Sequence, residues 1–232
     1  MHPDETVYHR HDRYFRYAFA TPEAGADLVA LTVQHELLDA LRVVKVESGG
    51  VSLVDEQLGE ERLDLLVTLE GAEGDMTLVY FLFEHKAHPD TDVLFQLFHY
   101  VGSVWRRCRA EGTVNRDGRV PNIIPVVVYH GSRPWNAPTQ LEDAISTVGR
   151  ATLSIPDHRF SYLLFDLQRI SADAIAGGAR VRAAVLALKY TAERLTKPAV
   201  RALLEAMGDE EVDAGFRRTT LRYLIEHREE SE

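Results

Sequence analysis

Two neighbouring stretches decide the fold of this chain: Leu63-Asp64-Leu65-Leu66-Val67-Thr68-Leu69, and Met76-Thr77-Leu78-Val79-Tyr80-Phe81-Leu82-Phe83, which runs on into Glu84-His85-Lys86. Both are rich in Leu, Val, Phe and Tyr, and the polar segment 71–75 between them is typical of a turn. We therefore predict an antiparallel hairpin. Its nearly continuous apolar runs indicate strands buried on both faces, as in an α/β protein.

Two carboxylates interrupt these apolar strands. Asp64 lies inside the first strand and Glu84 ends the second. A buried carboxylate costs several kcal/mol unless it is paired or bound to a metal. With the turn centred near residue 73, Asp64 is predicted to face residue 82, diagonal to Glu84. Diagonal backbone positions lie about 7–8 Å apart, so both carboxylates could reach one cation.

The predicted site suits Mg²⁺ or Mn²⁺, which bind carboxylates, carbonyl oxygens, waters and substrate phosphate. The backbone carbonyl of His85 is the predicted third metal ligand, beside Asp64 and Glu84. Glu84 and Lys86 are two residues apart, so they share a face if the strand continues. Lys86 would then orient water or stabilise charge on the phosphate. The spacing alone leaves a second interpretation open, a surface ion pair at a strand end.

Composition and length favour a folded protein of the cytoplasm. The chain has 232 residues, of which 45% are hydrophobic and 27% are charged, as is usual for globular proteins. Its start is polar and acidic, and no apolar run approaches the roughly 20 residues that span a bilayer. Cys108 is the only cysteine, so no internal disulfide can form. We therefore expect no membrane association and a reducing compartment.

The net charge of −10 argues against tight non-specific binding to nucleic acid. Between Arg106 and Arg119, however, five arginines stand against two acidic residues. This local excess permits a basic groove beside a metal that neutralises phosphate.

The remaining pattern predicts further elements and two regions. Helices are expected at 10–20, 21–41 and 91–111, and strands at 43–54, 123–129 and 160–167. After residue 171 the composition shifts to Ala, Leu, Arg and Glu, which predicts helices at 179–196, 198–207 and 209–228. We therefore divide the chain into an α/β domain, 1–170, and a C-terminal helical region, 171–232. This region is expected to serve homo-oligomer contacts rather than DNA binding.

The spacing of these polar residues resembles that of a known group of enzymes. Asp64 followed by Glu84-x-Lys86 resembles the PD-(D/E)XK nuclease superfamily, and Gln96 with Tyr100 is similar to a Q-x-x-x-Y motif of some of its branches. Over residues 9–170 the chain resembles the Rpn family (recombination-promoting nuclease, putative transposase, YhgA-like). The matching stretches are His11-Asp12, Phe15-Arg16, Glu47-Ser48-Gly49, Asp64-Leu65-Leu66, Phe83-Glu84-His85-Lys86, Pro89-Asp90, Pro125 to Gly131, and Pro134-Trp135.

The resemblance implies a restriction-endonuclease-like core, in which helices flank a mixed β-sheet. It also implies a Mg²⁺-dependent DNA endonuclease linked to recombination or mobile elements. The implied catalytic residues are Asp64, Glu84, Lys86, Gln96 and Tyr100. The chain departs from the family's usual pattern at Arg16, where lysine is common, and at Lys86, where glutamine is common.

Two alternatives to a DNA endonuclease stay open from the sequence. One is a catalytically weak module that binds nucleic acid or protein on the same fold, and the other is a nuclease that cleaves RNA. Two single residues also stay open. Asp12 is either an extra acid near the metal or a helix-cap or structural residue. His130 is either a residue of the active-site loops or a hydrogen-bonded histidine in a turn.

Overall fold

The computed structural model describes residues 3–33, 43–49, 52–55, 59–62, 64–71, 78–146, 159–193 and 195–229. These residues form a mixed five-stranded sheet in the order β1-β4-β5-β6-β7, with a separate β2-β3 hairpin. The strands are β1 (Val43–Gly49), β2 (Ser52–Asp55), β3 (Gly59–Arg62), β4 (Leu65–Gly71), β5 (Leu78–Lys86), β6 (Asn122–Tyr129) and β7 (Leu163–Asp166). The α-helices are α1 (Pro3–Phe19), α2 (Pro22–Thr32), α4 (Val93–Glu111), α5 (Leu141–Ala144), α7 (Ala179–Ala192), α8 (Lys197–Gly208) and α9 (Ala214–Glu229). The predicted α/β class and mixed sheet are confirmed.

The central hairpin has the predicted antiparallel pairing but a different register. β4 pairs with β5 so that Leu65 faces Phe83 and Leu66 faces Leu82. Continued by one residue, this register places Asp64 opposite Glu84. The prediction that Asp64 faces residue 82 is therefore wrong by two positions, because the ladder is centred on residue 74 rather than 73. Directly opposite positions lie about 4.5–5.5 Å apart at Cβ, nearer than the predicted diagonal.

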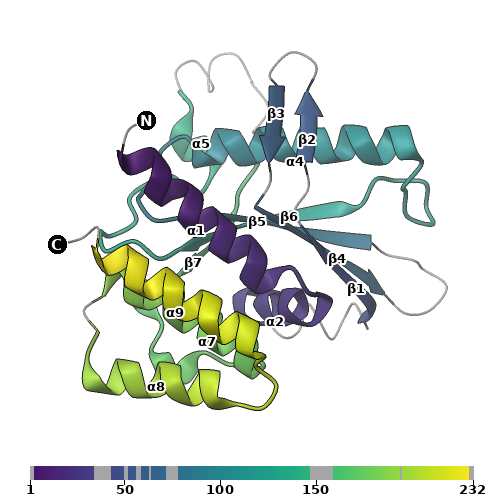
Figure 1. The fold of residues 1–232 in the computed structure, drawn as a ribbon. Helices are drawn as coiled ribbons and strands as arrows, with labels where there is room; N and C mark the ends of the chain where they lie inside the picture. The colour runs from purple at the N-terminus through teal and green to yellow at the C-terminus, as the bar shows by residue number, and fades with distance from the viewer. Residues whose placement is uncertain are drawn as a thin grey trace.

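Helices cover both faces of the sheet (Figure 1). β5 and β6 run parallel, and the crossover between them contains α4, which lies on one face. α1, α2 and α7 cover the other face, and α9 packs on α1 and α7. Because successive side chains of a strand point to opposite faces, the side chains of β4 and β5 are shared between the hydrophobic cores on the two faces of the sheet. Phe81 and Phe83 belong to the core under α1 and α7, whereas Tyr80 and Leu82 belong to the core under α4.

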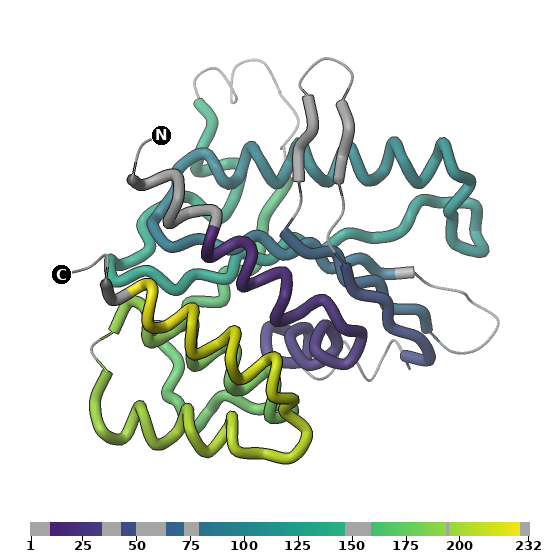
Figure 2. The backbone as a smooth tube through the Cα atoms, in the orientation of Figure 1, coloured from purple at the N-terminus to yellow at the C-terminus, as the bar shows by residue number. Residues whose placement is uncertain are grey.

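The first and last helices of the described chain pack together on the sheet face that α1, α2 and α7 cover. α1 and α9 lie side by side although they come from opposite ends of the sequence (Figure 2). The ring of Tyr14 stacks on Tyr223 with centroids 4.0 Å apart, and its hydroxyl lies 3.0 Å from the Thr220 Oγ1 atom. α7 is almost wholly buried and shares one hydrophobic cluster with α1, α2 and the sheet. The helices predicted after residue 171 are thus present, and α7 packs directly on the α/β layer. The domain boundary at residue 170 stays a prediction.

Most predicted elements are found, with differences at their ends. Thr21 caps α2 by accepting a hydrogen bond from the Ala24 N–H at 3.3 Å, as predicted. α2 ends at Thr32, and residues 34–42 of the predicted helix lie outside the described residues. α1 begins at Pro3, before the predicted start, and α9 begins only at Ala214. β3 was not predicted, because Gly59-Glu60-Glu61-Arg62 has no apolar alternation. None of the described helices combines the length and hydropathy needed to cross a membrane.

Gly25 in α2 lies directly against β1 and β4. A Cβ atom at Gly25 would lie 2.7 Å from Ser48 Oγ and 3.2 Å from Val67 Cγ2. Ser48 has little freedom to move away, since its hydroxyl donates to the Phe19 carbonyl at 2.8 Å. We expect Gly25→Ala to lower the free energy of unfolding by about 1–2 kcal/mol, because overpacking outweighs the helix propensity of alanine.

Gly102 in α4 is the matched control, because nothing lies within 4 Å of a Cβ atom built there. Gly102→Ala should raise the free energy of unfolding by up to about 1 kcal/mol. Urea denaturation of both variants measures the difference. A stabilising Gly25→Ala would mean that α2 does not pack against β1 and β4 as described.

Candidate active site

Four of the five predicted catalytic side chains form one buried hydrogen-bonded group. The Lys86 ammonium lies 3.1 Å from Glu84 Oε1 and donates to Gln96 Oε1 at 3.0 Å. The Gln96 amide donates in turn to Glu84 Oε1 at 3.0 Å and to the Tyr100 hydroxyl at 2.7 Å. Glu84, Lys86 and Tyr100 are all buried. The structure thus brings together residues from β5 and α4 that the sequence places ten or more positions apart.

Strand and helix geometry explain this convergence. Glu84 and Lys86 are alternate residues of β5 and point to the face that α4 covers. Gln96 and Tyr100 lie one helical turn apart in the first half of α4, so they share one side of the helix. Asp90, in the connection between β5 and α4, accepts from the Lys86 ammonium at 3.0 Å. Lys86 is therefore held by acceptors from the strand, the loop and the helix.

Asp64 lies immediately before β4, beside Glu84 in the continued register. Its Oδ2 atom accepts the backbone N–H of His85 at 3.0 Å. The N–H and C=O of one strand residue point to the same side, so the His85 carbonyl also faces the β4 edge where Asp64 lies. This places the backbone group predicted as a metal ligand beside Asp64.

The electrostatics of Glu84 favour a bound cation. Burial and, next, the nearby Asp64 charge raise the pKa of the Glu84 carboxyl from 4.5 to about 8, against a smaller lowering by Lys86. Its second oxygen, Oε2, is buried and has no hydrogen-bond partner. A buried acceptor without a partner is rare and costly, and a divalent ion held by Glu84 and Asp64 would satisfy it. The residues present therefore fit Mg²⁺ or Mn²⁺. The meeting of these two carboxylates on one ion stays a prediction.

The side chain of His85 points to the opposite face of the sheet. Its Nδ1 atom lies 3.2 Å from Asp12 Oδ1 and 3.7 Å from Asp64 Oδ2, and its Nε2 atom lies 3.1 Å from His130 Nε2. The Asp12 contact is an ion pair whose alignment is poor for a hydrogen bond. Burial alone would lower the pKa of His85, but the carboxylates of Asp12 and Asp64 outweigh burial and raise it to about 9. The two carboxylates therefore favour the protonated form of His85.

The positions of Asp12 and His130 narrow their predicted roles. Asp12 lies inside α1 rather than at its end, so it is not a helix cap. It faces His85, next to Asp64. His130 follows β6, is buried, and contacts His85 and the Thr191 hydroxyl, as expected for a hydrogen-bonded histidine.

Sequence reasoning did not identify Asp90 or Thr191 as neighbours of these polar groups. Asp90 follows Lys86 by four residues, but this spacing predicts an ion pair only on a helix, and Asp90 lies in the connection between β5 and α4. Thr191 comes from α7, far along the chain, and carries no local signal.

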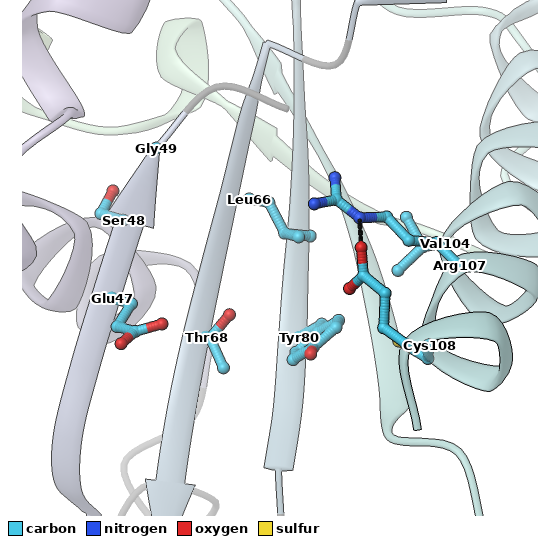
Figure 3. Close-up of a pocket in the computed structure, with 10 residues that line it drawn as sticks. Glu47, Ser48, Gly49, Leu66, Thr68, Tyr80, Val104, Arg107 and Cys108 are labelled. Atoms are coloured by element: carbon cyan, nitrogen blue, oxygen red, sulfur yellow. Dashed lines mark hydrogen bonds and ion pairs between the residues drawn. The ribbon is translucent and has the colours of Figure 1, made fainter. Parts of the chain in front are cut away.

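A groove of about 280 Å³ lies on the α4 face of the sheet, between α4 and strands β1, β4 and β5 (Figure 3). Leu66 and Thr68 line it from β4, the strand that Asp64 precedes, and Tyr80 lines it from β5, the strand that carries Glu84. Arg107 reaches into the groove but pairs with Glu111 at 2.7 Å. The predicted basic groove is thus partly neutralised at this point.

Comparison with known proteins gives a family match that includes all the residues of the candidate site. The family described as "Putative transposase, YhgA-like" matches residues 9–214 of the chain. The recombination-promoting nuclease RpnD of Escherichia coli O157:H7 is 26% identical over 189 residues, which cover 79% of this chain and 68% of that protein. No solved structure matches the chain significantly. The matched region extends past residue 170 and includes α7 and α8.

The raised pKa of Glu84 predicts how stability depends on pH in metal-free protein. Because the pKa rises from 4.5 to about 8 on folding, the folded state favours the neutral acid. Stability from this protonation is fully present below about pH 4.5 and is lost as pH rises towards 8. We expect the free energy of unfolding of the wild type to fall over this range relative to Glu84→Gln, which stays neutral.

Urea denaturation in EDTA at several pH values measures this difference. Added Mg²⁺ should reduce it at pH 8, because the cation stabilises the charged carboxylate. Parallel pH curves for the two proteins would show that the pKa of the Glu84 carboxyl is the same in the folded and unfolded states.

Proposed function

Because the chain belongs to the YhgA-like family of putative transposases, we propose that it is a metal-dependent endonuclease that hydrolyses phosphodiester bonds in DNA. The recombination-promoting activity named for its relative from Escherichia coli supports a role in DNA recombination or in mobile elements. The observation that carries the proposal is the buried group formed by Glu84, Lys86, Gln96 and Tyr100 beside Asp64. A purely structural group would not require a buried carboxylate oxygen without a partner.

Asp64, Glu84 and the His85 carbonyl are the proposed ligands of Mg²⁺ or Mn²⁺. Carboxylate and carbonyl oxygens are the ligands that these hard cations prefer. When bound, the ion would supply Lewis-acid polarisation of the phosphate and a water of lowered pKa. The backbone N–H of His85 holds the Asp64 carboxylate in place at 3.0 Å, so this ligand is oriented before any ion binds.

Lys86 and the two α4 residues have distinct proposed roles. The Lys86 ammonium presents a positive charge to the phosphate or orients the attacking water. Gln96 fixes Lys86 and Glu84 together, because its carbonyl accepts from one and its amide donates to the other. Tyr100 accepts the second amide hydrogen and so sets the orientation of Gln96. Both α4 residues would preorganise the charged pair on β5.

Two surfaces are proposed to bind partners, one for nucleic acid and one for a second copy of the chain. The groove of Figure 3 lies on the same sheet face as Glu84 and is the proposed path for one nucleic-acid strand. Homo-oligomer contacts through the C-terminal helices also stay a proposal. They are favoured by Leu204, Leu221 and Ile225, which are exposed on α8 and α9. A cytoplasmic location is proposed in keeping with a DNA substrate.

Substitution at the site separates catalysis from binding. We expect Lys86→Ala to lower the rate of plasmid nicking in Mg²⁺ by about two to three orders of magnitude, as for loss of a preorganised charge. Lys86→Gln should keep intermediate activity, because glutamine retains a donor but lacks the charge. Asp64→Ala should be inactive, because a metal ligand is lost. Affinity for DNA, titrated in parallel, should change far less.

Lys197→Ala provides the control, since Lys197 is an exposed lysine at the start of α8. It should nick plasmid at the wild-type rate, and EDTA should stop nicking by both proteins. Equal cleavage by wild type, Lys86→Ala and Asp64→Ala would refute the assignment. Metal-dependent cleavage of RNA but not of DNA would favour the RNA nuclease. DNA or protein binding with no cleavage by any variant would favour the binding module.

A further inference from the structure

Three histidines gather on the face of the sheet opposite the candidate nuclease site. His11 comes from α1, His85 from β5, and His130 follows β6. Their side chains are exposed by 3%, 0% and 1%, respectively. One ring nitrogen of each lies within 4.8 Å of one ring nitrogen of the other two. Together they can offer three nitrogen ligands to one ion.

The outward ring nitrogen of each histidine already faces an oxygen. His11 Nδ1 lies 2.5 Å from the Tyr223 hydroxyl, and His130 Nδ1 lies 3.2 Å from the Thr191 hydroxyl. His85 Nδ1 faces the Asp12 carboxylate at 3.2 Å. In metal sites, the ring nitrogen of a histidine that does not bind the ion usually faces an oxygen atom. This contact fixes the tautomer and leaves the other nitrogen free to bind the ion. The Nε2 atoms are therefore the ones available to a shared ligand.

The spacing of these nitrogens suits a transition metal. His85 Nε2 and His130 Nε2 are 3.1 Å apart. Two nitrogens bound to one zinc ion at about 2.0–2.1 Å and a tetrahedral angle lie about 3.4 Å apart. A small adjustment of the two rings is enough to admit the ion. A His11 ring nitrogen lies within 4.8 Å of a ring nitrogen of each of the other two histidines, so a shift of the His11 ring would complete a three-nitrogen set.

The protonation states are also compatible with ligation. Burial, together with the charge on His85, lowers the pKa of His11 to about 3 and that of His130 well below its ordinary value. Both rings are therefore neutral at pH 7 and each has one lone pair to donate. At His85, the ion would replace the hydrogen on Nε2, the atom that faces His130, while Nδ1 keeps facing Asp12.

We propose that His11, His85 and His130 form a second metal site, for Zn²⁺ or a similar imidazole-binding transition ion, separate from the oxygen-ligand site on the α4 face. Imidazole nitrogen suits Zn²⁺, Ni²⁺ and Cu²⁺, whereas Mg²⁺ takes oxygen ligands. The ion ties α1 to the ends of β5 and β6, and through Tyr223 and Thr191 to α9 and α7. Its role is structural, because it holds the N-terminal helix against the strand whose other face carries Glu84 and Lys86.

The test is Co²⁺ binding to the full-length chain after metal removal by a chelator. We expect the intense visible absorption of a nitrogen-ligated, near-tetrahedral Co²⁺ ion to reach its maximum at about one such ion per chain. Binding should be lost in His130→Ala and His11→Phe. It should persist in His88→Ala, which removes an exposed histidine nearby, and in Glu84→Gln, which alters only the oxygen site. Failure of the proposed nuclease would leave this spectrum unchanged, so the two proposals are tested separately.

Thermal unfolding covers the case in which a histidine variant does not fold. Zn²⁺ at about 100-fold above its dissociation constant should raise the Tm of the metal-free wild type by roughly 5–10 °C. Folded His11→Phe, whose apolar ring fills the space of the imidazole, should show no such rise. Absence of both Co²⁺ absorption and a Zn²⁺-induced Tm shift in the wild type would overturn the proposal. It would leave a metal-free hydrogen-bond chain from His85 through His130 to Thr191. Equal Co²⁺ binding by wild type and folded His11→Phe would overturn it as well.

Discussion

The alternation of side chains at the end of β5 is the constraint on which the rest of the structure depends. Successive strand residues point to opposite faces, so Glu84 and Lys86 project towards α4 while His85 projects towards α1. Three consecutive polar residues therefore serve two separate buried environments. Each environment must supply partners for its own polar groups, because an unpaired charge in a core costs several kcal/mol.

On the α4 face, partners come from a nearby helix. Gln96 and Tyr100 are one helical turn apart, and the amide of Gln96 joins the Glu84–Lys86 pair to Tyr100. On the other face, partners come from distant parts of the chain. Asp12 lies in the first helix and Thr191 in α7, and both reach the histidines on the strand ends. Asp64 contacts His85 at the edge of β4 and so links the two environments.

This arrangement gives the C-terminal helices a part in the centre of the molecule. α7 lies in the main hydrophobic cluster, and α9 packs against α1 through the stacked rings of Tyr14 and Tyr223. The same Tyr223 hydroxyl meets His11. Displacement of α9 would therefore change the surroundings of the histidines and, through His85, of Asp64. The family match to residue 214 agrees with a fold that continues past the α/β layer.

The sequence by itself determined the hairpin, the α/β class, and the shared faces of Glu84 with Lys86 and of Gln96 with Tyr100, whereas the family resemblance implied that these two pairs form one site. These features depend on local periodicity and on spacings of two or four residues, which strand and helix geometry convert directly into position. Only the tertiary structure decided the register that puts Asp64 opposite Glu84, because that depends on the centre of a turn. It alone also decided the gathering of His11, His85 and His130. Their contacts span from 45 to more than 200 residues, and no local pattern encodes which distant helix will cover a given strand end.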